Sequence, residues 1–324
     1  MRVVNFVFVP ALVITLGCSA GSASAPVTPR AAAGQTGATS EAPAAAGVMT
    51  ASDDAAASAS DSWWTESQPC LAGAELKGAA PPQGNAVWCE QAGKPHGPKT
   101  TFYASGQREA TRTFYQGRAH GRFTTWHDTG TMAEEGRQLN GALEGHWTRY
   151  YRSGAKELEG EYHAGKETGV FKKFAEAGAV LEELRYREGL QHGTTRVFYE
   201  SGKLKEETEY GSGVKQGMSR TYYENGQQRT VGLFASDKQT GVWRSWRENG
   251  VSLEERKYVD GVKEGPTTRW QVTGAKELEG AYKADEKDGA FNYYDKDAEL
   301  TKTEEYKNGR LISTKKFPKK PKRH

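Results

Sequence analysis

The chain has 324 residues and carries 44 Lys and Arg side chains against 41 Asp and Glu, a formal net charge of +3. So small an excess, with both signs interleaved along the sequence, argues against a nucleic-acid-binding protein. Basic residues gather only in the tail, residues 313–324, which is predicted to be a solvated, disordered end. Contact of this tail with anionic lipid is the alternative.

The N-terminus has the pattern of an export signal. An apolar run at 3–17 follows Arg2, is too short to span a bilayer comfortably and leads into small residues. Leu16-Gly17-Cys18 resembles the lipobox of bacterial lipoproteins. This resemblance implies that residues 1–18 are a signal peptide and that Cys18 is lipidated and becomes the new N-terminus, which would anchor the chain to a membrane.

The residues after Cys18 refine this expectation. Ser19 replaces the aspartate associated with inner-membrane retention, so a two-membraned bacterium is expected to send the lipoprotein to its outer membrane. Ordinary cleavage after Ala23-Ser24-Ala25, which would release a soluble secreted protein, is the alternative. Residues 19–62 are mostly Ala, Ser, Thr, Gly and Pro and are predicted to be a disordered linker.

Residues 63–96 are predicted to form an N-terminal cap. Gly73 and Gly93 fit the repeat pattern that follows, but the aromatics of that pattern are missing. Cys70 and Cys89 form an even pair in an exported protein, which predicts a disulfide that would contribute roughly 3 kcal/mol. A metal or redox pair is the alternative, but neither a CxxC spacing nor clustered histidines support it.

Residues 97–312 contain nine copies of a 24-residue unit. Positions are counted from the first glycine of each copy as zero. Position 5 is aromatic in all nine copies, and position 9 is glycine and position 17 aromatic in eight each. The first glycines are Gly97, Gly121, Gly145, Gly169, Gly193, Gly217, Gly241, Gly265 and Gly289.

Each copy is predicted to be a β-hairpin. The arm at 218–223 is rich in strand-forming residues, and Glu224-Asn225-Gly226 predicts a three-residue turn with a glycine bulge. If this turn pairs the flanking residues directly, positions 5 and 17 share one face, the core. Segment 189–193 would be a loop between hairpins. The fold is thus predicted to be all-β: tandem hairpins in an elongated, twisted, single-layer antiparallel sheet.

Position 2 provides the candidate binding surface. By the same parity it lies opposite the core, where an aromatic row could stack sugar rings or contact a partner. The alternative is that the ribbon curls or dimerises and buries this row. Its aromatic members are Phe123, Trp147, Phe171, Trp243 and Phe291.

Catalytic residues, a metal site and a cofactor are not predicted. His96, His120 and His192 precede a first glycine, and repeats about 9.6 Å apart separate such histidines too far to share a metal ion. Six glutamates at position 14, with Lys and Arg interleaved, indicate a charge-balanced solvated face rather than the carboxylate pair of a hydrolase. They are Glu135, Glu159, Glu183, Glu207, Glu255 and Glu279.

Gly217-Met-Ser-Arg-Thr-Tyr-Tyr-Glu-Asn-Gly226 and Glu159-Gly160-Glu161-Tyr162 resemble the bacterial MORN-repeat variant, and the resemblance covers about residues 94–312. It implies tandem hairpins that serve as a scaffold or binding surface, without catalytic residues. Some members of this family are labelled antitoxins of the YwqK type. A looser likeness is to choline-binding cell-wall modules, which have shorter repeats.

The sequence therefore predicts an exported, non-enzymatic repeat protein, anchored to the bacterial cell envelope by lipid, that binds an unidentified protein or envelope polymer. The alternative is an antitoxin or immunity protein that masks a toxin with the same surface.

Overall fold

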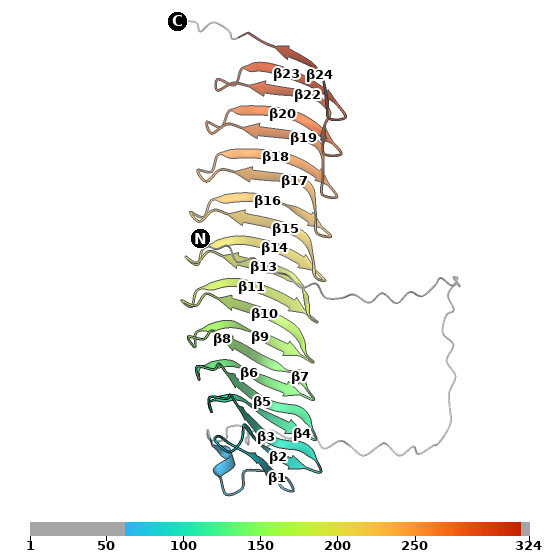
Figure 1. Cartoon of the computed structure of the whole chain (residues 1–324). Coiled ribbons are helices and arrows are strands. Elements are labelled where there is room, and N and C mark those ends of the chain that lie inside the picture. Colours follow the sequence, from blue (N-terminus) through green and yellow to red (C-terminus); the bar gives the residue numbers. More distant parts are fainter. Residues whose placement is uncertain (1–61, 319–324) are drawn as a thin grey trace, which may run out of the picture. The chain divides into compact units, whose positions relative to one another are not determined.

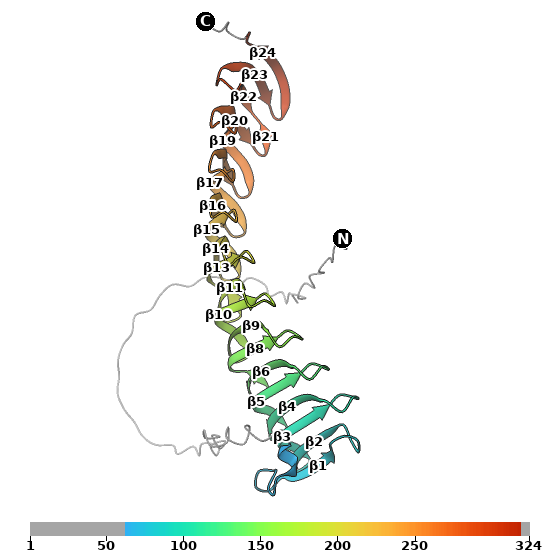
Figure 2. The same ribbon diagram turned by 90° about the vertical axis from the view of Figure 1, so that its left-hand side faces the viewer.

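The computed structural model describes residues 62–318. Cys18, the predicted signal peptide, all but one residue of the predicted linker and the last six residues lie outside this range. The described residues form one antiparallel sheet of 24 strands in which chain neighbours pair. Figures 1 and 2 show these strands stacked in a single layer that twists along the stack. The predicted all-β fold is confirmed.

The cap contains a short 3₁₀ helix, η2 (Trp63–Thr65), and two strands, β1 (Glu75–Ala79) and β2 (Ala86–Gln91). The remaining strands follow in chain order: β3 (Lys94–Phe102), β4 (Arg108–Tyr115), β5 (Arg118–Trp126), β6 (Met132–Leu139), β7 (Ala142–Leu143), β8 (Gly145–Tyr150), β9 (Lys156–His163), β10 (Lys166–Phe174), β11 (Val180–Arg187), β12 (Leu190–Gln191), β13 (Gly193–Phe198), β14 (Leu204–Gly211), β15 (Val214–Tyr222), β16 (Gln228–Ala235), β17 (Lys238–Trp246), β18 (Ser252–Val259), β19 (Val262–Trp270), β20 (Lys276–Lys283), β21 (Glu286–Lys287), β22 (Gly289–Tyr294), β23 (Leu300–Lys307) and β24 (Arg310–Lys316).

The turn inside each repeat has the predicted form. The Tyr223 N–H donates to the Gln227 carbonyl at 2.8 Å, and the Gly226 N–H donates back to the Tyr223 carbonyl at 2.9 Å. Gly226 has a φ of 88°, the left-handed conformation that glycine adopts without steric cost. This three-residue turn alone would keep the parity of the two strands.

A second bulge reverses that parity. In the first repeat Thr101 pairs with Ala110 but Phe102 pairs with Arg108, so Glu109 has no partner across the hairpin. The same shift occurs at position 12 of all nine hairpins. One extra residue moves every later side chain of the strand to the other face. Position 17 therefore shares a face with position 2, and the prediction that positions 5 and 17 form one core is wrong.

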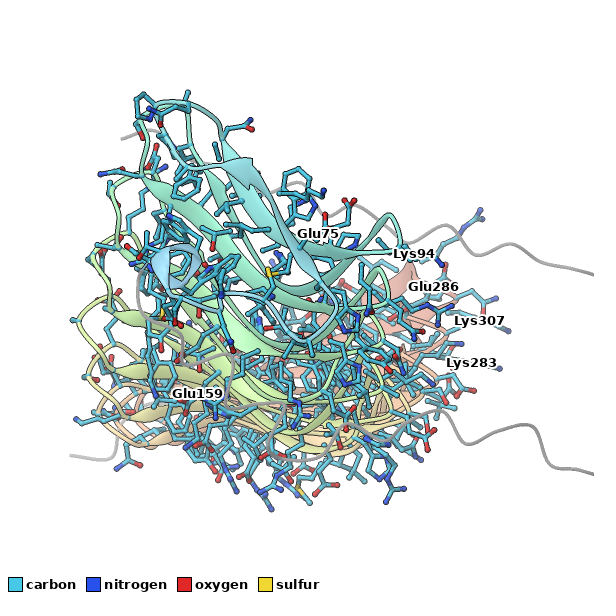
Figure 3. The ribbon with its side chains drawn as sticks, turned by 90° about the horizontal axis from the view of Figure 1, so that it is seen from below. Glu75, Lys94, Glu159, Lys283, Glu286 and Lys307 are labelled. Atoms are coloured by element: carbon cyan, nitrogen blue, oxygen red, sulfur yellow. A yellow bond between two sulfur atoms is a disulfide. The ribbon has the colours of Figure 1, made fainter. Side chains whose placement is uncertain are left out.

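The connection between repeats is also tighter than predicted. Glu188 and Gly189 both have positive φ values, 52° and 81°, as a two-residue type I′ hairpin turn requires. Leu190–Gln191, predicted to lie in a loop, is strand β12 and pairs with β11. The chain is thus a continuous antiparallel meander in which a short strand and the strand after it, such as β12 and β13, pair with the same neighbour, here β11. Figure 3, viewed along the stack, shows Lys283, Glu286 and Lys307, which flank such turns, at one edge of the sheet.

Position 2 belongs to the core. Of the two alternatives left by the sequence, an exposed row or a buried one, the structure has the buried row. Exposure is 4% for Phe123, 6% for Trp147, 4% for Phe171 and 0% for Phe291, and Trp243 is half-buried. These rings therefore do not form an exposed binding row. We call the face that carries positions 2, 15 and 17 the core face.

Rings of positions 2 and 17 alternate along the core face. Trp147, Tyr162, Phe171 and Tyr186 form successive edge-to-face contacts with centroids 5.7, 5.3 and 5.2 Å apart. Leu143, Leu158 and Leu184 pack against them. Burial in this open sheet thus comes from neighbouring repeats, since each ring is covered by rings of the same or the next hairpin.

Glycine at position 15 makes room for this packing. A Cβ atom on Gly160 would lie 2.5 Å from the Phe171 ring. All four glycines of position 15, Gly136, Gly160, Gly232 and Gly280, are overlain by the ring at position 2 of the next repeat. Where position 15 holds Leu184, Thr208 or Arg256, the next position 2 is the smaller Thr195, Ser219 or Thr267. Phe123 follows Arg112 instead, whose guanidinium lies 5.1 Å from the ring centroid.

The two ends of the sheet differ. At the N-terminal end the predicted Cys70–Cys89 disulfide is present, and Trp63, Val87, Cys89 and Phe102 form a separate buried cluster. At the C-terminal end, β24 contains Lys315 and Lys316, which were predicted to lie in the tail, and every residue of this strand is exposed. Among the described residues, only the N-terminal end of the sheet is covered, by the cap.

The substitution Gly160→Ala tests the packing rule. The added methyl group collides with Phe171, and such overpacking should cost about 1–3 kcal/mol, measured as a lower midpoint of urea unfolding. Adding Phe171→Thr, the residue type found after Leu184, should restore part of the loss. Gly211→Ala is the matched control because its nearest neighbour would be the Gln216 Cβ at 3.4 Å, an ordinary van der Waals distance. Equal midpoints for Gly160→Ala and wild type would contradict the rule.

Candidate binding surface

The face opposite the core carries positions 3, 5 and 14, and we call it the ladder face. Because of the bulge, the position-5 aromatics stand on this face, one in every repeat. Phe102 is 8% exposed under the cap, whereas the others are half-buried. These are Trp126, Tyr150, Phe174, Phe198, Tyr222, Trp246, Trp270 and Tyr294. The sequence predicts this aromatic row but predicts it in the core, and that placement is wrong: the fold presents the row as an aromatic surface.

Positions 3 and 14 alternate along the middle of the ladder face. They pair across each hairpin, as Arg196 does with Glu207, and across each junction, as Glu183 does with Arg196. The Arg196 guanidinium lies 3.8 Å from Glu183 and 3.0 Å from Glu207, and Glu207 is also 3.4 Å from Arg220. From Glu183 to Arg220, basic and acidic side chains therefore form a continuous ion-pair ladder, which Val231 ends in the sixth repeat.

Towards both ends of the array, neutral residues replace the basic ones at position 3. The Tyr150 hydroxyl donates to Glu135 at 2.6 Å, and burial together with this hydrogen bond raises the pKa of Tyr150 to about 12. Tyr294 donates to Glu279 in the same way, and hydrogen bonds from Lys276 and Tyr294 lower the pKa of Glu279. Tyr150 and Tyr294 therefore stay neutral hydrogen-bond donors at neutral pH, and Glu279 stays ionised.

Position 6 fixes the aromatic row to the backbone. In seven of the eight junctions its side chain contacts the carbonyl oxygen of position 5 in the next repeat at hydrogen-bonding distance. Tyr199, for example, donates to Tyr222 at 2.7 Å. The residues are Tyr103, His127, Tyr151, Tyr199, Tyr223, Arg247 and Gln271; the eighth junction has Ala175, which has no polar side-chain atom. Sequence reasoning missed this set, although the doubled aromatic at positions 5 and 6 was visible.

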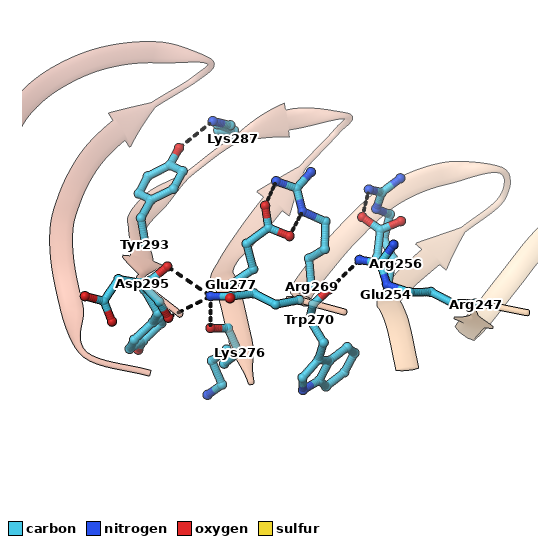
Figure 4. A network of polar contacts seen from close by, with 12 residues as sticks. Arg247, Glu254, Arg256, Arg269, Trp270, Lys276, Glu277, Lys287, Tyr293 and Asp295 are labelled. Carbon is cyan, nitrogen blue, oxygen red and sulfur yellow. Dashed lines mark hydrogen bonds and ion pairs between the residues drawn. The ribbon is translucent and has the colours of Figure 1, made fainter. Parts of the chain in front are cut away.

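Figure 4 shows how neighbouring residues divide between the faces in the eighth and ninth repeats. Arg269 and Glu277, joined by two hydrogen bonds of 3.0 and 2.8 Å, stand on one side of the ribbon with Tyr293. Trp270 and Lys276 project on the other side. Two consecutive residues therefore contribute to chemically different surfaces: Arg269 forms an ion pair on the core face, and Trp270 places its indole on the ladder face.

A groove of about 520 Å³ lies over repeats 1 to 3. Small residues such as Thr101, Ala110 and Ala133 line it together with charged ones. Arg149 in its wall is paired with Glu157 at 2.9 Å. The groove is polar, and its basic groups already have partners within the chain, since Arg112 donates to Gln138 at 3.3 Å.

Within residues 62–318, no three His, Cys, Asp or Glu side chains are arranged to hold a metal ion. The same stretch has no helix whose length and apolarity would let it cross a membrane. His96 and His120, which the sequence placed at one edge of the ribbon, both lie beside the Tyr115 ring, with centroid distances of 5.1 and 6.0 Å.

Comparison with known proteins finds a family match for one segment of the chain. A model described as a MORN repeat variant matches residues 191–211, which span β12 to β14. This match supports a MORN-repeat family. The other repeats of the chain share the period and turns of the matched segment. No curated protein matches the chain.

Two solved structures illustrate the structural comparison. "Crystal Structure of TcdB2-TccC3-Cdc42" is 12% identical, with a TM-score of 0.17, and the match covers 72% of this chain and 17% of that one. "Crystal Structure of TcdB2-TccC3-TEV" is 11% identical, with a TM-score of 0.19 and the same coverage. The chain spans less than a fifth of either, and TM-scores this low carry no structural argument.

Tyr199→Phe tests the hydrogen bonds of position 6. Losing the hydroxyl leaves the Tyr222 carbonyl without this donor and should lower the free energy of unfolding by about 1 kcal/mol. Tyr222→Phe is the matched control, because no hydrogen bond of its own hydroxyl is present among the described residues. Calorimetric or denaturant unfolding of both variants provides the comparison, and equal losses would contradict a specific role for position 6.

Proposed function

We propose that this chain is a non-enzymatic repeat scaffold of the bacterial cell envelope that presents its ladder face to a protein or envelope polymer. The observation that carries the proposal is the row of half-buried position-5 aromatics, repeated along one face of the sheet. Aromatic rings that remain accessible in a regular row supply large contact area at low entropic cost, and such patches mark interaction sites.

Two features support an extracytoplasmic location. The apolar run followed by Leu16-Gly17-Cys18 has the form of a lipoprotein signal, so we infer that Cys18 carries the lipid anchor. The Cys70–Cys89 disulfide holds the cap together, and structural disulfides persist mainly in oxidising compartments. The repeats would then stand outside the membrane at the end of the linker.

The alternative is an antitoxin or immunity protein that covers a toxin with the same face. The sequence resemblance supports this second function, because some members of the MORN-repeat variant family are labelled antitoxins, and a MORN repeat variant model matches one segment of the chain. The two functions differ in compartment and in partner, while the surface they would use is the same.

Intact mass and membrane fractionation of the full-length gene product distinguish the scaffold function from the antitoxin function. The scaffold proposal predicts a product that begins at Cys18, is heavier by a diacylglycerol-type modification, and sediments with membranes. In Cys18→Ala the modification and the membrane association should both be lost. An unmodified, soluble product that starts at Met1 would overturn the envelope proposal and favour the antitoxin.

A further inference from the structure

The N-terminal cap shows how one repeat of the ladder face is covered. The indole N–H of Trp63 donates to the Thr100 hydroxyl at 3.0 Å, and Trp63 is 3% exposed. The ring of Trp64 meets Phe102 edge-to-face, with centroids 5.6 Å apart and planes at 86°. Two adjacent tryptophans thus satisfy a hydroxyl at position 3 and a ring at position 5 of the same repeat.

The same two groups recur without such a cover in repeats 2 and 8. Thr124 and Trp126 occupy positions 3 and 5 of the second repeat, and Thr268 and Trp270 those of the eighth. All four residues are half-buried, and neither threonine hydroxyl has a hydrogen-bond partner within residues 62–318. In Figure 4 the Trp270 ring projects on the side of the ribbon opposite Arg269 and Glu277.

The second repeat differs in one respect. The Arg108 guanidinium lies 4.4 Å from the centroid of the Trp126 ring. A cation over one face of the Trp126 ring still leaves the edge of the indole accessible. This edge can make an edge-to-face contact, which is the geometry that Trp64 and Phe102 adopt. The eighth repeat has no such cation over Trp270 among the described residues.

The other repeats are closed at this position. In the third repeat Thr148 is 1% exposed and its hydroxyl lies 3.2 Å from His146. In the ninth, Asn292 bonds to Glu279 and Thr303. Repeats 4 to 7 hold Lys172, Arg196, Arg220 and Arg244 at position 3, and the three arginines pair with glutamates of the ladder. An indole N–H finds an acceptor hydroxyl in repeats 2 and 8 alone among the uncapped repeats.

We propose that repeats 2 and 8 each bind a tryptophan-bearing peptide segment of a partner protein in the manner of the cap. The partner's indole N–H would donate to Thr124 or Thr268, and a neighbouring aromatic ring would pack on Trp126 or Trp270. This inference rests on the proposed scaffold function and specifies its partner as a protein with exposed tryptophans. Six repeats separate the sites, roughly 58 Å at two strand spacings per repeat, so a partner with two such segments would gain avidity.

The cap supplies the probe for the test. A blocked heptapeptide with the sequence of residues 62–68, Ser-Trp-Trp-Thr-Glu-Ser-Gln, is labelled with 5-fluorotryptophan and titrated with the full chain by ¹⁹F NMR. Saturable binding is expected. Thr124→Val combined with Thr268→Val should weaken it about tenfold, the usual effect of one lost hydrogen bond, and Trp126→Ala with Trp270→Ala should abolish it.

Matched controls separate recognition from folding. Thr125→Val changes the neighbouring threonine on the core face and should leave the affinity unchanged. A peptide with 1-methyltryptophan lacks the indole N–H donor and should bind the unaltered chain about tenfold more weakly. This second measurement needs no variant, so a misfolded variant cannot decide the result.

The outcomes distinguish this inference from the proposed function. Absence of saturable binding, or equal affinity for the methylated and unmethylated peptides, overturns the inference. If the chain then binds isolated envelope glycans that the peptide does not displace, the scaffold function stands with a different ligand class. If neither peptide nor envelope polymer binds and the chain is cytosolic and unmodified, the scaffold function fails as well.

Discussion

A single unpaired residue in each hairpin decides which side of the sheet the returning strand shows to solvent. The bulge at position 12 follows a turn that would otherwise keep parity, and it moves positions 13 to 17 to the other face. Because the unit is repeated nine times, a one-residue shift determines two rows that run the length of the array. The core face and the ladder face both depend on this register.

The register explains the recurrent Glu-Gly-x-Tyr segment. In Glu159-Gly160-Glu161-Tyr162, Glu159 joins the ladder face, Gly160 leaves room for the Phe171 ring, and Tyr162 contacts the rings of Trp147 and Phe171. Each residue type therefore has a separate physical reason. Stability along the array comes from contacts between neighbours, as expected for a repeat protein, and the cap closes one end with a disulfide and two tryptophans.

The sequence predicted much of this architecture, but it could not predict the bulge. Exact 24-residue periodicity, Asn-Gly turns and paired cysteines have strong local signals, and the hairpins, the glycine turn and the disulfide follow from them. Position 12 has no such signal, because a bulge places little restriction on the side chain of its unpaired residue. Different repeats hold Glu109, Ala133, Leu181 or Arg229 there. The rows of positions 2 and 5 were therefore predicted on the wrong faces: position 2 lies on the core face and position 5 on the ladder face.

Hydroxyl-radical footprinting of the unaltered chain, read by mass spectrometry at individual tryptophans, tests the face assignment most directly. Trp147 at position 2 is 6% exposed, whereas Trp246 and Trp270 at position 5 are half-buried on the ladder face. We expect Trp246 and Trp270 to be oxidised several times faster than Trp147. Oxidation of Trp147 at the same rate as Trp270, or faster, would place position 2 at the surface and contradict the account.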